Sequence, residues 1–142
     1  MQIKFTINDL AVRNKLTSLA AQGHNLRPLM QDIGEEARRI VEKNFEAGGR
    51  PGQWEPSARS KRDGGKPLTD KGTLRRSITV AADNTSVRVG TNVKYARIHQ
   101  LGGNAGRGQK VRIPARPYLV IPAADESGIV KIAKSYFEGI FK

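Results

Sequence analysis

The 142-residue sequence contains no cysteine, few aromatic residues and no apolar run of the length that spans a bilayer. Without cysteine, no disulfide framework, thiolate nucleophile or cysteine-ligated zinc site can form, and a reducing cytoplasm is compatible. The N-terminal residues 1–10 lack the charged and then apolar pattern of a signal peptide. We therefore expect a soluble protein that is not secreted by the usual route, folded as a single domain over residues 1–142.

Acidic residues are also scarce. Thirteen Asp and Glu stand against 25 Lys and Arg, which gives a net charge of +12, and the isoelectric point is near 10.5. The excess lies in two segments: eight cations face three acids from Arg50 to Arg76, and six face none from Lys94 to Arg116. Such an excess predicts an anionic partner, which could be nucleic acid, an anionic membrane face or an acidic protein surface.

The first half of the chain has the pattern of a short strand followed by two helices. Apolar residues alternate with polar ones over 3–7, which predicts a strand. Asn8 or Asp9 can cap a helix that ends near Gly23.

The strongest helical pattern follows a cap at Asn25, has Pro28 in its first turn and ends at the glycine pair 48–49. Its polar face carries Glu35 and Glu36 beside arginines, which predicts an ion-paired surface and not a catalytic carboxylate pair. Its apolar residues recur every three or four positions: Leu26, Leu29, Met30, Ile33, Ala37, Ile40, Val41 and Phe45.

The second half alternates short elements. Residues 78–89 have the pattern of a β-hairpin, residues 95–101 of a short helix ended by Gly102, and residues 110–113 of a further strand or arm. Three prolines make 114–122 extended, and an amphipathic helix begins near Asp125. The expected class is α+β, with long N-terminal amphipathic helices and a C-terminal helix packed on a small antiparallel sheet.

Two glycine-rich basic stretches, about 49–66 and 102–112, show no apolar period and are expected to be long functional or assembly loops. The first contains Trp54, the only tryptophan of the chain. Two interpretations are open: Trp54 anchors the loop to its own core, or it contacts a partner.

Residues 66–78, "KPLTDKGTLRRSI", have a composition that fits either a phosphate-binding segment or the start of a helix. Asp70 can cap the helix, and Leu74 one turn later can pack toward Leu68. We therefore interpret the stretch as a structural joint that leads into the hairpin. Lys71 and Arg76 point outward in this interpretation and face DNA or an acidic neighbour.

The sequence contains no complete motif for catalysis or ligand binding. Gly103 and Gly108 have the spacing of a phosphate-binding loop, but Gln109 and Lys110 replace its lysine and hydroxyl residue. His24 and His99 are too isolated for a zinc site, and His99 is expected to be a partly buried helix residue. We predict no enzyme, no metal and no cofactor. Few aromatics accompany the cations, so a standalone nucleic-acid-binding module is only an alternative, while nonspecific phosphate contact stays open.

The order of the motifs is informative. A long helix, a tryptophan in a basic loop, "PLTDKGTLRRSI", a hairpin, "VGTNVKYARIHQLGG", a glycine-rich loop, "IPARPYL" and a final helix together resemble the virion-morphogenesis family of Mu-like phages and prophages, related to tail-completion proteins. The positions that recur in that family are Leu68, Asp70, Gly72, Leu74, Arg75, Ser77, Tyr95, Ala96, His99, Gly102, Pro114, Arg116, Pro117 and Leu119.

The resemblance implies a non-enzymatic subunit of a ring in the virion neck, at the interface of head and tail, after assembly in the host cytoplasm. Its expected partners are copies of itself and neighbouring head-connector and tail proteins, with no membrane and with nonspecific contact to packaged DNA left open. A tail-terminator or head-closure role in the same connector is an alternative. We expect assembly or DNA contacts from Arg50, Trp54, Arg59, Lys61, Arg62, Lys66, Lys71, Arg76, Arg107, Lys110 and Arg112.

Overall fold

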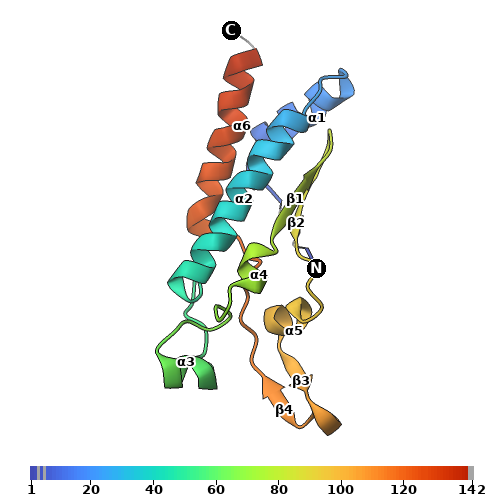
Figure 1. Ribbon diagram of the computed structural model, residues 1–142. Coiled ribbons are helices and arrows are strands. Elements are labelled where there is room, and N and C mark those ends of the chain that lie inside the picture. The colour runs from blue at the N-terminus through green and yellow to red at the C-terminus, as the bar shows by residue number, and fades with distance from the viewer. Residues whose placement is uncertain (3, 5, 141–142) are drawn as a thin grey trace. The chain divides into compact units, whose positions relative to one another are not determined.

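The computed structural model describes residues 1, 2, 4 and 6–140, and its helices and short strands make it an α+β protein (Figure 1). The chain divides into two compact units. The helical unit contains Ile3–Ile40, Thr79–Val89 and Ile121–Lys142, and the basic unit contains Met1–Gln2, Val41–Ile78 and Gly90–Val120. The predicted α+β class is confirmed, with two small antiparallel sheets where one was expected, whereas organisation as a single domain stays a prediction.

Two helices begin the helical unit, each where its cap was expected. Helix α1 spans Leu10–Ala21, and the Asp9 side chain accepts a hydrogen bond from the backbone N–H of Val12 at 3.1 Å. Helix α2 spans Arg27–Ala47, and the Asn25 side chain accepts from the backbone N–H of Arg27 at 3.2 Å. Both side chains satisfy donors that a helix start leaves unpaired.

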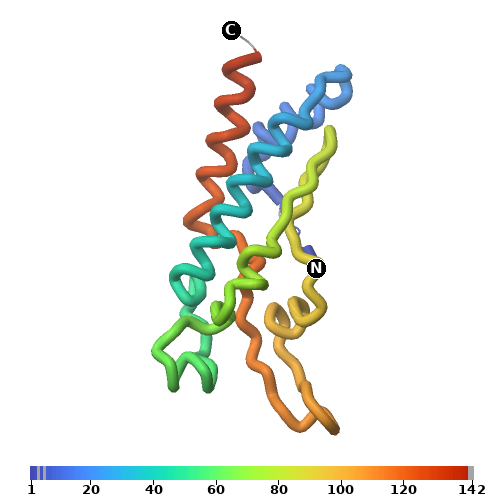
Figure 2. Tube along the Cα trace, viewed as in Figure 1, coloured from blue at the N-terminus to red at the C-terminus, as the bar shows by residue number. Residues whose placement is uncertain are grey.

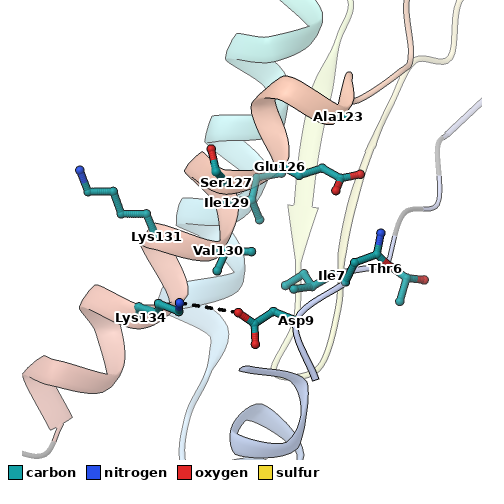
Figure 3. A pocket seen from close by; sticks show the side chains of 11 residues that line it. Thr6, Ile7, Asp9, Ala123, Glu126, Ser127, Ile129, Val130, Lys131 and Lys134 are labelled. Carbon is teal, nitrogen blue, oxygen red and sulfur yellow. Dashed lines mark ion pairs between the residues drawn. The ribbon is translucent and has the colours of Figure 1, made fainter. Parts of the chain in front are cut away.

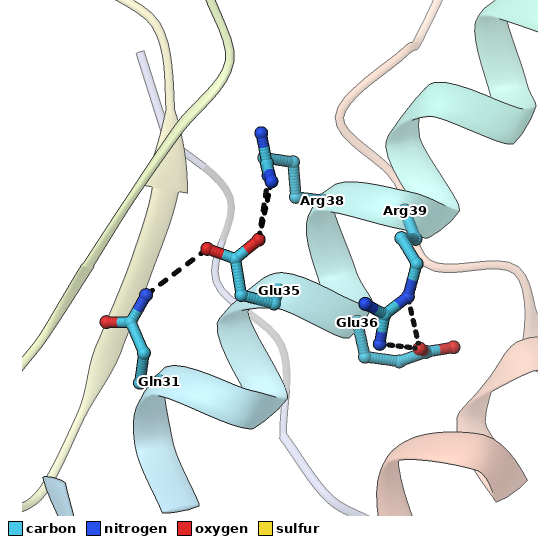
Figure 4. A network of polar contacts seen from close by, with 5 residues as sticks. All are labelled: Gln31, Glu35, Glu36, Arg38 and Arg39. Atoms are coloured by element: carbon cyan, nitrogen blue, oxygen red, sulfur yellow. Dashed lines mark hydrogen bonds and ion pairs between the residues drawn. The ribbon is translucent and has the colours of Figure 1, made fainter. Parts of the chain in front are cut away.

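The two faces of α2 differ as the sequence pattern requires. On the exposed side, the Arg38 and Arg39 guanidinium groups lie 2.7 Å from the carboxylates of Glu35 and Glu36, and Gln31 donates to Glu35 (Figure 4). The predicted ion-paired surface is therefore present. All eight apolar residues expected on the other side are buried: Leu26, Leu29, Met30, Ile33, Ala37, Ile40, Val41 and Phe45.

Helix α6, Glu126–Ile140, follows the 3₁₀ turn η2, Ala123–Asp125, and runs beside α2 (Figure 2). Two apolar clusters fill the helical unit. One joins α1, α6 and Leu26, the residue before α2, through Val12, Leu19, Leu26, Ala133 and Phe137. The other consists of Leu29, Met30, Ile33, Ile40 and Ile129, with Ala82 and Val87 packed against it.

The predicted hairpin is confirmed as β1, Thr79–Ala82, paired with β2, Val87–Gly90. The Asp83 carboxylate closes its turn by accepting from the backbone N–H groups of Thr85 and Ser86, at 2.8 and 2.7 Å. These bonds lower the pKa of Asp83 to about 2, because they stabilise its charged form. The strand predicted over 3–7 includes residues 3 and 5, which lie outside the described residues.

The basic unit has short elements: α3 (Ala58–Asp63), α4 (Thr73–Arg76), α5 (Ala96–Leu101), β3 (Gly103–Ala105), the 3₁₀ turn η1 (Arg107–Gln109) and β4 (Val111–Ile113). The expectation of an unstructured loop over 49–66 is wrong at α3. Ser57 and Ser60 form a reciprocal capping box, and Gly64, with φ of 76°, ends the helix. The six residues carry no apolar period that could have revealed them.

The expectation of a loop over 102–112 is also wrong for most of that stretch. β3 and β4 pair antiparallel, with Gly103 opposite Ile113, Asn104 opposite Arg112 and Ala105 opposite Val111. The strand at β4 was predicted, but its partner was not, because three residues that include a glycine give no strand signal.

Three aromatic rings form the centre of the basic unit. The ring of Phe45 lies 5.7 Å from that of Trp54 and 5.4 Å from that of Tyr118. Trp54 Nε1 donates to the Pro117 carbonyl at 3.0 Å, and the Tyr118 hydroxyl donates to the Ala96 carbonyl at 2.9 Å. Burial raises the pKa of Tyr118 to about 12. Trp54 is therefore a core anchor, as the first of its two interpretations held.

Two side-chain amides hold the extended segment that contains Tyr118. The buried Asn44 donates to the carbonyls of Tyr118 and Val120, at 2.9 and 3.0 Å. Gln100 accepts from the backbone N–H groups of Tyr118 and Leu119 and donates to the Leu119 carbonyl. Side chains thus supply the partners that a sheet would otherwise give to this backbone.

Candidate assembly surface

The charge of the protein is concentrated in one unit. The basic unit has fifteen Lys and Arg against five Asp and Glu, a net charge of +10. The helical unit has ten against eight, a net charge of +2. A field that attracts anions therefore originates from the basic unit.

The predicted contact cations fall into two groups. Several are held within the unit: Arg59 donates to the Lys66 carbonyl at 2.7 Å, Arg76 donates to the Lys71 carbonyl at 2.8 Å, and Lys66 Nζ donates to the Glu46 carbonyl. Arg62 pairs with Asp63, Arg112 lies 3.8 Å from Glu55, and the half-buried Arg50 donates to Asn44. No hydrogen bond or ion pair with the described residues holds four exposed side chains: Lys61, Lys71, Arg107 and Lys110.

The predicted cap at Asp70 is wrong. Helix α4 begins at Thr73, so its N-cap is Gly72, which has φ of 74° and makes no side-chain bond. Asp70 precedes that cap by two residues and is exposed, so its carboxylate does not close the first turn. The helix is held by its buried Leu74 and by Arg75, which lies 3.0 and 3.1 Å from the carboxylates of Glu42 and Glu46.

Seven of the fourteen positions that the family resemblance singled out meet around one cavity of about 300 Å³ in the basic unit, named here the motif pocket. Most of its lining comes from residues 68–72 before α4, from α4 itself, from α5 and from the extended segment that contains Tyr118. The other seven positions are not in its lining: Arg75, Ser77, Ala96, Gly102, Pro114, Pro117 and Leu119. The residues that line it are Ser57, Arg59, Leu68, Asp70, Lys71, Gly72, Thr73, Leu74, Tyr95, His99 and Arg116.

Arg116 and His99 are the recessed polar groups of the motif pocket. Arg116 is 6% exposed; its Nε donates to the Glu55 carbonyl at 2.7 Å, and its backbone N–H donates to the His99 carbonyl at 2.7 Å. Burial lowers the pKa of Arg116, although the Glu55 carboxylate opposes that shift. Burial, with the nearby Arg116 charge, lowers the pKa of His99. The buried Nδ1 of His99 has no hydrogen-bond partner among the described residues.

Sequence reasoning missed Asn44 and Gln100, although they place the wall that carries Arg116. A signal for Asn44 was present, since it is polar and lies between Val41 and Phe45 on the apolar side of α2. A buried polar residue on such a face requires partners. Gln100 has no comparable signal, because its helix is too short for a clear apolar face.

A larger cavity of about 610 Å³ belongs to the helical unit, between residues 6–9 and α6 (Figure 3). Lys134 and Asp9 form an ion pair of 3.6 Å at this cavity. None of the predicted site residues lines it. Over the described part of the chain, no His, Asp and Glu side chains gather as metal ligands would, and no helix is long and apolar enough to cross a membrane.

Comparison with known proteins agrees with the resemblance seen in the motifs. Residues 7–138 match the model of the phage virion morphogenesis family. The Mu-like prophage FluMu G protein 2 of Haemophilus influenzae is 41% identical over 141 residues, which cover 99% of each chain. No solved structure gives a significant match. The chain therefore belongs to the phage virion morphogenesis family.

Proposed function

We propose that this chain is a ring-forming subunit of the neck of a phage or phage-like particle, where it acts in tail completion and head–tail joining. Membership of its family gives it a role in phage virion assembly, among other structural proteins of the particle. That family is a structural one, which supports a role without catalysis. The observation that carries the finer proposal is the net charge of +10 on the basic unit.

The free cations suit a channel through which DNA passes. Lys61 lies on α3, Lys71 precedes α4, and Arg107 and Lys110 lie between β3 and β4. Long cationic side chains with no acidic partner bind phosphates by charge and release counterions, without reading sequence. A closed ring requires head-to-tail contacts between copies, so we assign protruding parts of the basic unit to those contacts or to the lumen. A tail terminator or head-closure protein would use the same surface.

A charge-reversal experiment tests the proposal. The triple variant Lys61→Glu, Arg107→Glu, Lys110→Glu removes free cations of the basic unit. The control Arg13→Glu, Arg27→Glu, Arg88→Glu makes the same charge change at exposed sites of the helical unit. Each is supplied in trans to a particle-forming phage that lacks the gene. We expect both variants to fold and only the first to lower titre, by about a hundredfold or more, with unjoined heads and tails in electron micrographs.

Equal titres for the two triple variants would contradict the proposal. Purified protein separates the alternatives further. A monomer that binds free duplex DNA tightly and loses affinity steeply with salt would favour a standalone nucleic-acid-binding module. Closed rings in micrographs of assembled necks, with this chain in them, would support the ring.

A further inference from the structure

We infer that the motif pocket is a binding site for a carboxylate, carried by an aspartate or glutamate side chain of another virion protein. This deepens the proposed function by naming the chemistry of a partner contact. It rests on the arrangement of Arg59, Lys71, Arg116 and His99 within one unit, and its test uses the isolated chain.

Arg116 is the central group. Its side chain is buried, yet only Nε makes a hydrogen bond with the described residues, to the Glu55 carbonyl. A guanidinium presents five N–H donors, and the terminal nitrogens of Arg116 are not among the fully buried atoms of the described residues that lack a partner, so they remain accessible to a ligand. Because Arg116 lines the motif pocket, an acceptor that enters the pocket can supply the missing partners.

The other polar groups of the pocket favour an anion over a cation. Arg59 and Lys71 add two positive charges, and the Lys71 ammonium has no partner among the described residues. Asp70 is the one acid in the lining and is exposed. Three cations against one carboxylate leave a net charge of +2. An anion would also lie near His99, whose Nδ1 has no described partner.

Shape and apolar lining favour a protein carboxylate over a DNA phosphate. Arg116 is only 6% exposed, and the cavity of about 300 Å³ has Leu68 and Leu74 in its lining. A phosphate within a duplex backbone is flanked by its neighbours and reaches exposed cations more readily than a recessed one. A glutamate brings methylenes as well as a flat carboxylate that matches the guanidinium fork. Tyr95, 46% exposed, offers a ring of the kind common in protein interfaces.

The test is an NMR titration of the isotopically labelled chain with a hexaglutamate peptide and, separately, with a short DNA duplex. We expect hexaglutamate to shift the Arg116 Nε–H and His99 ring resonances and to raise the pKa of His99, because a bound anion favours its charged form. The duplex should shift residues near Lys61, Arg107 and Lys110 instead. The site-specific resonances are needed because a chain of charge +12 attracts any polyanion.

Matched variants assign the effect to the pocket. Lys71→Gln should weaken hexaglutamate binding at Arg116 about fivefold, whereas Arg107→Gln, the same charge change outside the pocket, should leave it nearly unchanged. Asp70→Asn should strengthen it, since it removes the carboxylate of the pocket lining, which repels an anion. Arg116→Lys keeps the charge but loses the fork, and should weaken binding in a chain whose thermal unfolding confirms that it folds.

The inference is overturned if hexaglutamate leaves Arg116 and His99 unshifted, if Lys71→Gln and Arg107→Gln weaken binding equally, or if the duplex shifts Arg116 and His99 as strongly as the peptide does. It is also overturned if a photo-crosslinker placed at Tyr95 in assembled particles captures only further copies of this chain. Failure in the titration leaves the charge-reversal experiment on titre untouched, so the two proposals fail separately.

Discussion

The helical unit and the basic unit bury different kinds of group. Mostly aliphatic side chains, with Phe137 of α6 among them, fill the helical unit in two clusters. The basic unit is centred on the rings of Phe45, Trp54 and Tyr118, and side-chain amides hold the backbone beside them. Packing of long helices therefore shapes the first unit, whereas specific polar bonds shape the second, whose helices are too short to be stable alone.

Charges are handled differently as well. In the helical unit, arginines of α2 pair with carboxylates one turn away, which cancels charge locally. In the basic unit, Arg59, Arg76 and Arg116 donate to backbone carbonyls, which fixes the side chain without neutralising it. Arg62 beside Asp63, Arg75 between Glu42 and Glu46, and Arg112 near Glu55 are exceptions. Carbonyl partners thus let the basic unit order its cations and still present a positive field, as a polyanion or acidic partner requires.

The comparison is tested most strongly at Asn44. Asn44→Leu keeps the approximate volume but leaves the carbonyls of Tyr118 and Val120 without their donor. Because buried acceptors without partners are costly, we expect the free energy of unfolding to fall by about 3 kcal/mol in urea denaturation.

Asn14→Leu is the control, since Asn14 is exposed on α1 and makes no side-chain hydrogen bond with the described residues. A change within about 0.5 kcal/mol is expected there. If the two variants lose the same stability, the hydrogen bonds of Asn44 do not stabilise the basic unit as argued.

The helical unit should be sensitive to volume instead, and Gly34 is the position to probe. A methyl group added at Gly34 would lie 2.6 Å from Cγ2 of Val87 and closer still to Cγ1 of Val80. Overpacking outweighs the better helix propensity of alanine, so Gly34→Ala should cost about 1–2 kcal/mol in the same denaturation assay.

The same substitution at Gly139 provides a control of opposite sign. Apart from the neighbouring backbone of its own helix, no atom of the described residues lies within 4 Å of a methyl group added there, so Gly139→Ala should stabilise α6 by about 0.5 kcal/mol. Adding Val80→Ala to Gly34→Ala should recover part of the loss, because the two positions touch. Independent, additive effects would show that contact with the hairpin is not the cause.

The sequence predicted the helical unit better than the basic unit, for a physical reason. A capping side chain such as Asp9 of α1 or Asn25 of α2 is a strong local signal, and so are the apolar residues that recur along α2 and α6. The hairpin was equally readable, since a turn with Asp83 separates two alternating segments.

The basic unit is specified by contacts between residues distant in sequence. The capping box that starts α3 uses two serines, and β3 is a three-residue strand, so neither shows a period. The motif residues were identified from their resemblance to a family, but their convergence on one pocket depends on Asn44 and Gln100 placing the segment with Arg116. Local pattern cannot give such a placement.

The smallest effect on stability is expected at His99, a partly buried side chain that lies near the charge of Arg116. Burial first, and then the charge of Arg116, lowers the pKa of His99 below its ordinary value of 6.5. The unfolded chain therefore binds the proton more readily than the folded one, so stability falls as pH drops below about 6.5 toward the folded pKa. Arg59, Asp70, Lys71 and Arg116 line the same pocket and carry charges of their own, and Tyr95 lines it as well.

The stability of the wild type is therefore compared with that of His99→Gln, in urea denaturation from pH 7.5 to 5. The stability advantage of the wild type over His99→Gln should shrink as the pH falls, because only the wild type takes up this proton on unfolding. His24→Gln, at an exposed residue between α1 and α2, controls for the loss of a histidine. A difference that is independent of pH, or that widens toward acid, would mean that burial in the basic unit does not disfavour the imidazolium. That result would remove the electrostatic link between His99 and Arg116.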